Sequence, residues 1–387
     1  MLQFLDLPDE LLQQIFSCIS PRQVLKYRQL CRRLNQCLLD PHFAITNLRL
    51  HFDRRTSLSN EQPSEQDILW FQWPQVYQTV YAKHYISDLI ELQWHLESIN
   101  APLPKGLDQL FQLQTLVLAQ CELIGGIPSE IRQLTNLHTL VLANNMLDGP
   151  IPSWIGDLEN LKHLDLRNNG FTGRIPLFDQ MLNLIHLDFG RNNLVGPIPL
   201  LPACLISLFL DHNPLNTSFS FPTHQPNLLR LHLHNCQLSG SIPSDISIMF
   251  PSLQFLNASN NSLSGSLSIT FPATLQSLSL AHNALTGPIP ASLGTLQNLS
   301  LLNLSNNELS RGIPEELGHL QQGMRYLNLS NNRLSGTVPK SVIAMGKAAW
   351  MDISGNSFEV VGGWWAVQLW LRGMYLWGVC TSGFGYA

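Results

Sequence analysis

The stretch Leu137-His-Thr-Leu-Val-Leu-Ala-Asn-Asn-Met-Leu-Asp-Gly-Pro-Ile-Pro152 decides the fold, because its pattern L-x-x-L-x-L-x-x-N-x-L-x-G-x-I-P recurs along most of the chain. Twelve units cover residues 89–358 and follow one another at steps of 21 to 25 residues. They begin at Leu89, Leu113, Leu137, Leu161, Leu184, Leu205, Leu228, Leu253, Leu275, Leu299, Met324 and Ala348. A period in this range predicts a repeat solenoid.

Each part of the unit has a physical role. The L-x-L alternation predicts a short strand whose leucines point inward. The asparagine is expected to satisfy backbone groups where the chain leaves the strand, and Cys121 and Cys236 replace it in two units. Gly-x-Ile-Pro then takes the chain round the convex side. Because one unit cannot bury its own apolar face, we expect stacked units to share one leucine core.

This pattern resembles the plant-type leucine-rich repeats. The resemblance implies an α/β repeat solenoid, a horseshoe or superhelix with a parallel sheet on its concave face. Three units depart from the pattern: the unit at Leu205 lacks Gly-x-Ile-Pro, the unit at Leu299 has its glycine one place late, and the unit at Ala348 loses the motif after Phe358. Secreted receptors of this subclass usually begin with a paired-cysteine cap, whereas no cysteine lies between Cys37 and Cys121 here.

Residues 1–50 form a different module. Apolar residues from Leu7 to Ile19 follow a helical spacing, and Ser20-Pro21 predicts a turn and the start of a second helix. The segments 7–10, 15–19, 20–22, 30–34 and 40–43 resemble an F-box, a small all-α domain of about three helices. Leu30 and Leu34 stand where that family commonly has valine and tryptophan.

The resemblance to an F-box implies a partner, the Skp adaptor of cullin–RING ubiquitin ligases. By motif match, the adaptor-binding positions are Leu7, Pro8, Leu11, Leu12, Ile15, Ile19, Val24 and Leu25. Some of these side chains must pack inside so small a domain, and the sequence alone does not separate them from the exposed ones.

Two further segments flank the repeats. Residues 51–88 are expected to form a linker and an N-terminal cap, with a Trp/Tyr-rich helix from Trp70 to Tyr85. Residues 359–387 form a hydrophobic, Trp-rich tail, in which Gln368 and Arg372 interrupt the apolar run from Val360 to Cys380. A charge at the centre of a spanning helix costs about 2.5–3.5 kcal/mol. We therefore expect the tail to cover the end of the solenoid, with a membrane anchor as the alternative.

Function is expected on the outward positions of the concave strands, since the leucines are committed to the core. The middle strands carry charged residues, histidine and one phenylalanine, whereas later strands carry mostly asparagine and serine. We predict that the target-binding residues are His163, Asp165, Arg167, His186, Asp188, Arg191, Phe209, Asp211, Arg230, His232 and His234.

The sequence favours no catalytic chemistry. His232, His234 and Asp211 are a possible metal-ligand set, but a solvated Asp–His pair is the favoured interpretation, and no metal or other cofactor is expected. No phosphate-binding loop is present, and the serines are repeat residues rather than parts of a hydrolytic triad. The net charge of −5 and the pI of about 6.2 give no reason to expect a nucleic-acid partner.

Two functions remain open. In the first, the chain is the substrate-recognition subunit of a Skp–cullin–F-box ubiquitin ligase, whose F-box binds the adaptor and whose repeats bind a target protein. In the second, it is a ligand-binding or scaffold protein related to receptor ectodomains. Residues 1–10 do not resemble a signal peptide, so we expect an intracellular protein, cytoplasmic or nuclear. Six Asn-x-Ser sequons are relevant to the second function: Asn216, Asn257, Asn260, Asn298, Asn303 and Asn328.

Overall fold

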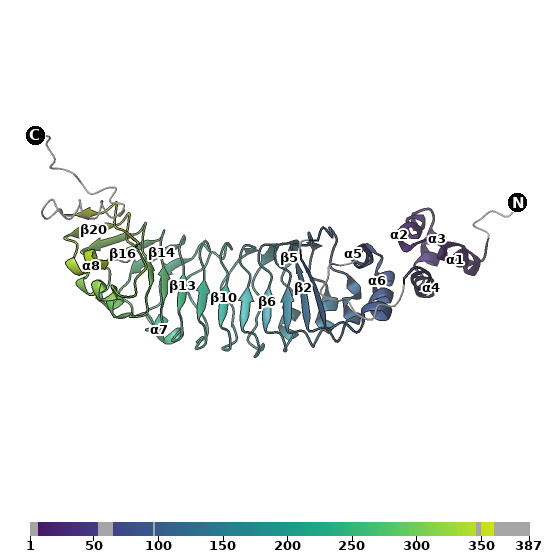
Figure 1. The fold of residues 1–387 in the computed structure, drawn as a ribbon, viewed down its shortest axis with the longest axis horizontal. Coiled ribbons are helices and arrows are strands. Elements are labelled where there is room, and N and C mark those ends of the chain that lie inside the picture. Colours follow the sequence, from purple (N-terminus) through teal and green to yellow (C-terminus); the bar gives the residue numbers. More distant parts are fainter. Residues whose placement is uncertain (1–6, 53–64, 96, 346–349, 360–387) are drawn as a thin grey trace, which may run out of the picture. The chain divides into compact units, whose positions relative to one another are not determined.

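The computed structural model describes residues 7–52, 65–95, 97–345 and 350–359 (Figure 1). The chain divides into two compact units, unit 1 at Met1–Phe171 and unit 2 at Thr172–Ala387. This boundary falls inside the repeats rather than at residue 50, 88 or 358, where the sequence changes character.

Unit 1 begins with the expected helical module. Its helices are α1 (Asp9–Ser17), α2 (Pro21–Val24), the 3-10 helix η2 (Leu25–Gln29), α3 (Arg32–Leu38) and α4 (Pro41–His51). α4 begins at Pro41, because the carboxylate of Asp40 accepts hydrogen bonds from the backbone N–H groups of His42 and Phe43 at 2.9 and 3.1 Å. Pro41 occupies the first helical turn, where its missing N–H costs nothing.

A cap rich in aromatic residues follows the module. One helix was expected from Trp70 to Tyr85, but Pro74 divides the segment into α5 (Glu65–Gln72) and α6 (Gln75–Tyr81), and a π-helical turn, η3, follows at Ala82–Ile86. The Trp70 indole N–H donates to the carbonyl of Gln78 at 2.9 Å, so the two helices are joined through a buried pair. Phe71 packs on Trp94 of the first strand with ring centroids 5.5 Å apart.

The contact between this cap and the first repeat requires a glycine. Gly106 lies in the 3-10 helix η4 (Lys105–Gln109), and a Cβ atom placed on it would lie 2.6 Å from the backbone of Gln78. The side-chain amide of Gln78 reaches the same helix, because its oxygen accepts from the backbone N–H of Lys105 at 3.0 Å. The first repeat therefore packs directly against α6.

The repeats of unit 1 form one parallel sheet, and its strands pair in register. The strands are β1 (Glu91–His95), β2 (Thr115–Ala119), β4 (Thr139–Val141) and β6 (His163–Asp165). In β1, Leu92 and Trp94 are buried and the alternate residues are exposed, as the L-x-L alternation predicts. Short 3-10 helices η5 (Ser129–Gln133) and η6 (Ser153–Asp157) follow Ile-Pro, and a two-strand ladder joins β3 (Ile124–Gly125) to β5 (Met146–Pro150).

Unit 2 continues the same architecture. Its main sheet, also parallel, contains β8 (His186–Asp188), β10 (Ser207–Phe209), β11 (Arg230–His232), β13 (Phe255–Asn257), β15 (Ser277–Ser279), β17 (Leu301–Asn303), β19 (Tyr326–Asn328) and β21 (Trp350–Asp352). The outward side chains of a main sheet are called its strand face below. The inward-facing leucines of these strands, such as Leu256 and Leu302, are almost completely buried, and they form the core.

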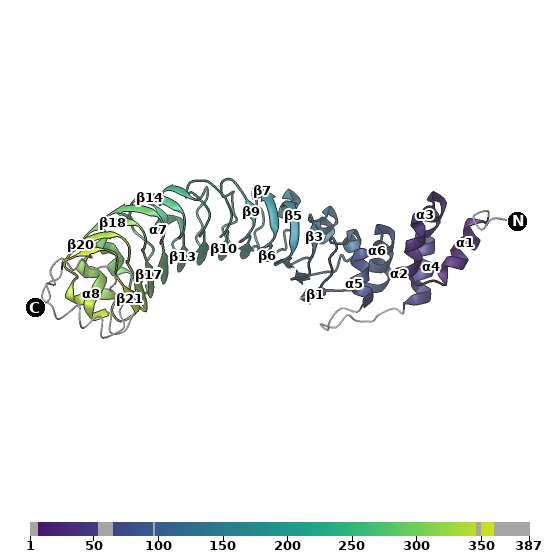
Figure 2. The same ribbon diagram turned by 90° about the horizontal axis from the view of Figure 1, so that it is seen from above.

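Unit 2 also contains a second set of strands, which the sequence analysis did not predict. They are β12 (Ser239–Ser241), β14 (Ser262–Ser266), β16 (Ala284–Gly287), β18 (Glu308–Arg311), β20 (Arg333–Gly336) and β22 (Ser357–Phe358). Figure 2 shows β14, β18 and β20 on the opposite side of the unit from β13, β17 and β21. β7 (Gly170–Gly173) pairs with β9 (Asn193–Leu194) through Thr172 and Gly173. The helical segments of unit 2 are α7 (Ile246–Met249), η7 (Ala291–Thr295), η8 (Glu315–Leu320) and α8 (Lys340–Met345).

The asparagine of each repeat has the expected structural role. The side-chain oxygen of Asn145 accepts from the backbone N–H groups of Cys121 and Leu123, in the preceding repeat, at 2.9 and 3.1 Å. Its amide nitrogen donates to the carbonyls of Leu118 and Leu142 at 2.7 and 2.9 Å. One side chain thus satisfies donors and acceptors of two consecutive turns. We call this series the asparagine ladder.

Cys236 shows how a substitution changes the ladder. Its thiol lies 3.2 Å from the carbonyl of Leu210, so a thiol can replace the amide as a weak donor. The thiol supplies no acceptor comparable to the asparagine oxygen. The backbone N–H of Leu215, in the preceding repeat, therefore donates to the carbonyl of Asn213 at 2.8 Å.

The predicted fold class is confirmed: a small helical module precedes a leucine-rich solenoid with a parallel sheet. The Trp-rich tail lies outside the described residues, so the structure does not distinguish a cap from an anchor there. Among the residues that are described, no helix combines the length and apolarity that crossing a bilayer requires.

Candidate interaction surfaces

Helix α1 of the helical module presents an apolar surface. Leu11 is 44% and Ile15 is 46% exposed, whereas Leu12 and Phe16, which follow them in the sequence, are buried. Positions 11 and 15 are four residues apart, so they lie on one side of the helix. An exposed leucine and isoleucine side by side on a helix are typical of a protein-binding surface.

The other predicted adaptor-binding residues divide into exposed and buried groups. Pro8 is exposed, and Leu7, Ile19 and Leu25 are half-buried. Leu12 and Val24 are completely buried, so their side chains belong to the core of the module rather than to its surface. Leu30 and Tyr27, which are not among the predicted adaptor-binding residues, are 70% and 40% exposed on the same module.

The start of α1 is fixed by Arg33 of α3. The guanidinium donates to the carbonyl of Leu7 at 2.6 Å and lies 2.8 Å from the Asp9 carboxylate. Hydrogen bonds from the Cys37 thiol and from Arg33 lower the pKa of Asp9. These contacts hold the segment at Leu7 and Pro8 against α3.

A buried polar side chain joins the helical module to the cap. The amide nitrogen of Asn47 in α4 donates to the carbonyls of Ser17 and Ile19 at 3.1 and 2.8 Å, where α1 ends. Its oxygen accepts from the hydroxyl of Tyr77 in α6 at 3.3 Å. Burial raises the pKa of Tyr77, so the hydroxyl keeps its proton and remains a donor.

The strand face of unit 1 contains three predicted target-binding residues. His163 and Arg167 are exposed, but Asp165 is only 8% exposed. Its carboxylate accepts from the backbone N–H of Arg167 at 3.1 Å and lies 3.6 Å from the guanidinium of the same residue. Burial raises the pKa of Asp165. Asp165 therefore contributes mainly to the turn at the end of β6.

Three rings form a ladder across the strand face of unit 2. The centroid of Phe209 lies 5.4 Å from that of His186 and 4.7 Å from that of His232. The guanidinium of Arg230, which lies on β11 like His232, is 5.4 Å from the ring centroid of Phe255 on β13, within the range of a cation–π contact. All of these side chains keep some exposure, so the ladder can contact a partner.

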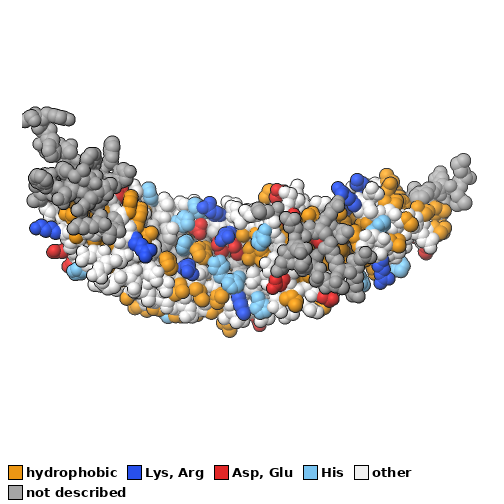
Figure 3. All heavy atoms as spheres, in the orientation of Figure 1, with side chains coloured by type: hydrophobic (Ala, Val, Ile, Leu, Met, Phe, Trp, Pro, Cys, Tyr) orange, Lys and Arg blue, Asp and Glu red, His pale blue; other side chains and the backbone are white. Residues whose placement is uncertain are grey.

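Beside this ring ladder lies a polar group at the ends of β10 and β11. Asp211 and His234 are 3.6 Å apart, and the rings of His212 and His234 are 4.8 Å apart. Burial lowers the pKa of His232 and His234, and the effect outweighs the opposite one of Asp211. The two imidazoles are therefore mostly neutral at pH 7. Figure 3 shows histidine, acidic and basic side chains gathered on this face.

The remaining predicted residues of this patch differ in access. Arg191 is exposed, in the left-handed region at φ 56°. Asp188 is 5% exposed, and its carboxylate accepts from the backbone N–H of Gly190 at 2.9 Å. Like Asp165, it contributes mainly to a turn.

The later strands carry a different surface. In the phrase Asn-x-Ser, the Asn303 oxygen accepts from both the N–H and the hydroxyl of Ser305, at 3.2 and 2.8 Å. Asn328 and Ser330 repeat this arrangement. At the end of the sheet, Tyr326 and Trp350 stack with centroids 4.5 Å apart and an interplanar angle of 8°. The asparagine and serine side chains hydrogen-bond to one another, so this part of the strand face offers few free polar groups.

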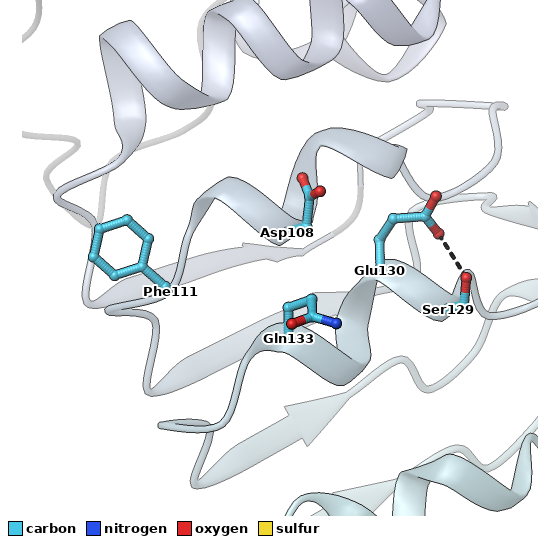
Figure 4. A pocket seen from close by; sticks show the side chains of 5 residues that line it. All are labelled: Asp108, Phe111, Ser129, Glu130 and Gln133. Carbon is cyan, nitrogen blue, oxygen red and sulfur yellow. Dashed lines mark hydrogen bonds between the residues drawn. The ribbon is translucent and has the colours of Figure 1, made fainter.

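An open pocket of about 470 Å³ lies on unit 1. Asp108, Phe111, Ser129, Glu130 and Gln133 line it, from η4 and η5 and the residues near them (Figure 4). The Ser129 hydroxyl donates to Glu130 at 3.2 Å. The Asp108 carboxylate accepts from the side-chain amide of Gln109 at 3.0 Å.

Family models match both modules. A model described as F-box-like matches residues 4–46, and models described as leucine-rich repeat match residues 104–171, 227–249, 252–273 and 273–334. The chain is an F-box-like protein with leucine-rich repeats. Both modules are protein-interaction modules.

The leucine-rich repeats also resemble those of curated plant proteins. Residue identity is 46% over 55 residues with the protein STRUBBELIG-RECEPTOR FAMILY 1 of Arabidopsis thaliana, covering 14% of this chain and 7% of that protein. It is 35% over 74 residues with STRUBBELIG-RECEPTOR FAMILY 3 of the same plant, covering 19% of this chain and 9% of that protein. The chain thus spans less than a tenth of these relatives.

Solved structures with a similar fold include plant receptor ectodomains. The leucine-rich repeat ectodomain of the Arabidopsis receptor kinase HAESA, solved with an IDA peptide hormone, matches with a TM-score of 0.63 and 34% identity, over 72% of this chain and 48% of that one. A TDR receptor matches with a TM-score of 0.64 and 27% identity, over 74% of this chain and 49% of that one. The chain therefore spans about half the length of these receptor structures.

Proposed function

We propose that this F-box-like protein is the substrate-recognition subunit of a Skp–cullin–F-box ubiquitin ligase, in the cytoplasm or nucleus. Its helical module would bind the Skp adaptor, and its repeats would bind the target. Such a subunit does no chemistry itself. It raises the effective concentration of the target near the ubiquitin carrier.

The observation that supports this proposal most directly is the surface of α1. Leu11 and Ile15 are exposed on a module that matches the F-box-like model. Leaving two branched apolar side chains in water is unfavourable by about 1.5–3 kcal/mol each relative to full burial. An adaptor that covers them recovers part of this free energy.

Co-purification with the adaptor tests the proposal. We expect the full-length chain to retain a co-expressed Skp adaptor, and Leu11→Asp or Ile15→Asp to weaken retention at least about tenfold, because each buries a charge in the contact. Leu50→Asp is the matched control, since Leu50 is 59% exposed on α4 of the same module. Circular dichroism must show that all variants are folded. Failure of the intact chain to bind the adaptor would refute the ligase proposal.

For the target, we propose the strand face of unit 2 around the ring ladder, together with the exposed Arg191. The exposed residues His163 and Arg167 are a separate proposed contact on unit 1. Two facts support this location. Large and charged side chains are concentrated there, and Phe209, Arg230 and His232 remain partly accessible. Aromatic residues and arginine are the residue types that contribute most to protein interfaces.

The likeness to receptor ectodomains favours a second candidate, a ligand-binding or scaffold protein. Sugar attachment separates the two. Asn216, Asn260 and Asn298 are exposed sequons, and glycans on them in the native host would place the chain outside the cytosol and support the second candidate. Their absence, together with adaptor binding, supports the ligase.

A further inference from the structure

The junction between the repeats that begin at Leu205 and Leu228 is unlike its neighbours in two respects. Cys236 replaces the ladder asparagine, so the acceptor for the preceding turn is lost. The second set of strands is also interrupted: between β9 and β12 the described chain contributes only an isolated bridge, from Ser218 to Ser239. Two interactions that join other repeats are therefore reduced here.

The strand face of the same junction carries unusual residues. Asp211 and His234 occupy the position where each strand of the main sheet ends. Elsewhere in unit 2 this position holds small residues, namely Gly190, Ser259, Ala281, Ser305, Ser330 and Ser354. His212 follows Asp211 in the left-handed region at φ 55°, where several other units have asparagine.

These three side chains converge. One ligand atom from each of Asp211, His212 and His234 lies within 4.8 Å of the other two, and the Asp211 oxygen and His234 Nε2 are 3.6 Å apart. Bonds of about 2.0–2.2 Å to zinc place tetrahedral ligand atoms roughly 3.3–3.5 Å from one another. Since no two of these atoms are more than 4.8 Å apart, they need to approach one another by at most about 1.5 Å to reach that geometry.

We propose that Asp211, His212 and His234 form a site for a divalent transition metal ion of the zinc class, which clamps the two repeats together. Two imidazoles and one carboxylate suit zinc, copper and nickel better than calcium or magnesium. Asp211 and His212 come from one repeat and His234 from the next, so the ion cross-links the junction. Three protein ligands leave a fourth position for water.

The surroundings support this assignment. Asp211 and His234 are 14% and 22% exposed, so both are largely sheltered yet open on one side. Nε2 of His234 faces Asp211, and the Asn257 amide nitrogen lies 3.4 Å from Nδ1. Binding of the ion through Nε2 places the imidazole proton on Nδ1, so the Asn257 amide must turn away from that nitrogen. The positive charge of Arg191 disfavours a bound cation here, and the negative charge of Asp211 offsets this repulsion.

Zinc titration of tag-free, metal-stripped full-length protein tests the site. We expect one equivalent of Zn²⁺ to bind and to raise the melting temperature, because the ion binds only the folded junction. Asp211→Ser, His212→Asn and His234→Ser should each weaken binding at least about tenfold. Each variant introduces the residue that other repeats carry at the same position, so the fold is retained.

His282→Asn is the matched control, because His282 occupies the position of His212 in a later repeat, also at positive φ (55°). Its zinc affinity should stay within about twofold of the wild type. Electron paramagnetic resonance of the Cu²⁺ form should show two nitrogen ligands, and one after His234→Ser. The site is refuted if the three variants bind zinc as the wild type does, or if the wild type binds none at 100-fold excess over protein.

Discussion

Two parts of the strand face of unit 2 carry different kinds of side chain on the same repeat backbone. On the later strands, Asn303 and Asn328 fold back on a serine two residues on, and their polar groups are used up locally. On β8 to β11, rings, arginines and the Asp211–His234 pair occupy the face, and only Asp188 caps a turn in the same way. Because the repeat folds with either set, the middle residues are not required by the fold. They are therefore the better candidates for binding.

The largest effect should come from the later repeats, where structure depends on asparagine. Asn332 is 8% exposed and its amide donates to the carbonyls of Leu304 and Leu329, while its oxygen accepts from Leu309 N–H. Asn332→Ala leaves these groups unpaired and should lower the free energy of unfolding by about 2–4 kcal/mol. Urea unfolding measures the loss. As a control, Asn193→Ala, at an exposed position, should change the free energy of unfolding by less than about 0.5 kcal/mol.

A smaller effect is expected from the middle strands. Phe209→Asn gives β10 the residue type of the later strands and removes the ring contacts with His186 and His232. Since Phe209 is only half-buried, the loss in unfolding free energy should be about 1 kcal/mol. A loss above about 3 kcal/mol in the same urea experiment would mean that the ring ladder is part of the core, and the contrast between the two parts would disappear.

The smallest effect should be a gain. Asp165→Asn keeps an acceptor for the N–H of Arg167 and removes a buried charge, so it should raise the free energy of unfolding near pH 7, by less than about 1 kcal/mol. Because burial raises the pKa of Asp165 in the folded state, the folded wild type binds a proton more readily than the unfolded chain.

The pH dependence of this gain follows from that difference. The wild type is destabilised above the raised pKa and recovers as the pH falls toward the unfolded value of about 3.9. The advantage of Asp165→Asn should therefore be full at pH 7 and vanish near pH 4. Melting temperatures measured between these values test it. An advantage that grows as the pH falls would show that the carboxylate is stabilised rather than strained.

Much of the fold could be predicted because the leucines have a fixed phase. Leu140 and Leu142 define one strand, and the same spacing twelve times defines the sheet. The second set of strands was missed because its segment, such as Ser262–Ser266, is short, polar and interrupted by Gly265 at φ 84°. Its pairing depends on the neighbouring repeat rather than on its own residues.

The candidate sites were less predictable. Helical spacing identified Leu11 and Leu12 together, but only the packing of α1 on α3 and α4 separates an exposed leucine from a buried one. His212 was left out of the predicted target-binding residues and of the ligand set, because a strand pattern assigns no direction to the residue after the strand. Its positive φ turns the side chain toward His234, and that backbone angle cannot be derived from histidine itself.

The asparagine ladder also has a direction, and this bears on synthesis. Asn145, Asn261 and Asn332 each accept hydrogen bonds from the repeat before their own, 22 to 25 residues earlier. A nascent chain leaving the ribosome therefore cannot complete one turn until the asparagine of the next repeat has emerged. We expect the solenoid to fold in the order of translation. The repeat that emerged last would lack its asparagine hydrogen bonds until the next repeat leaves the exit tunnel.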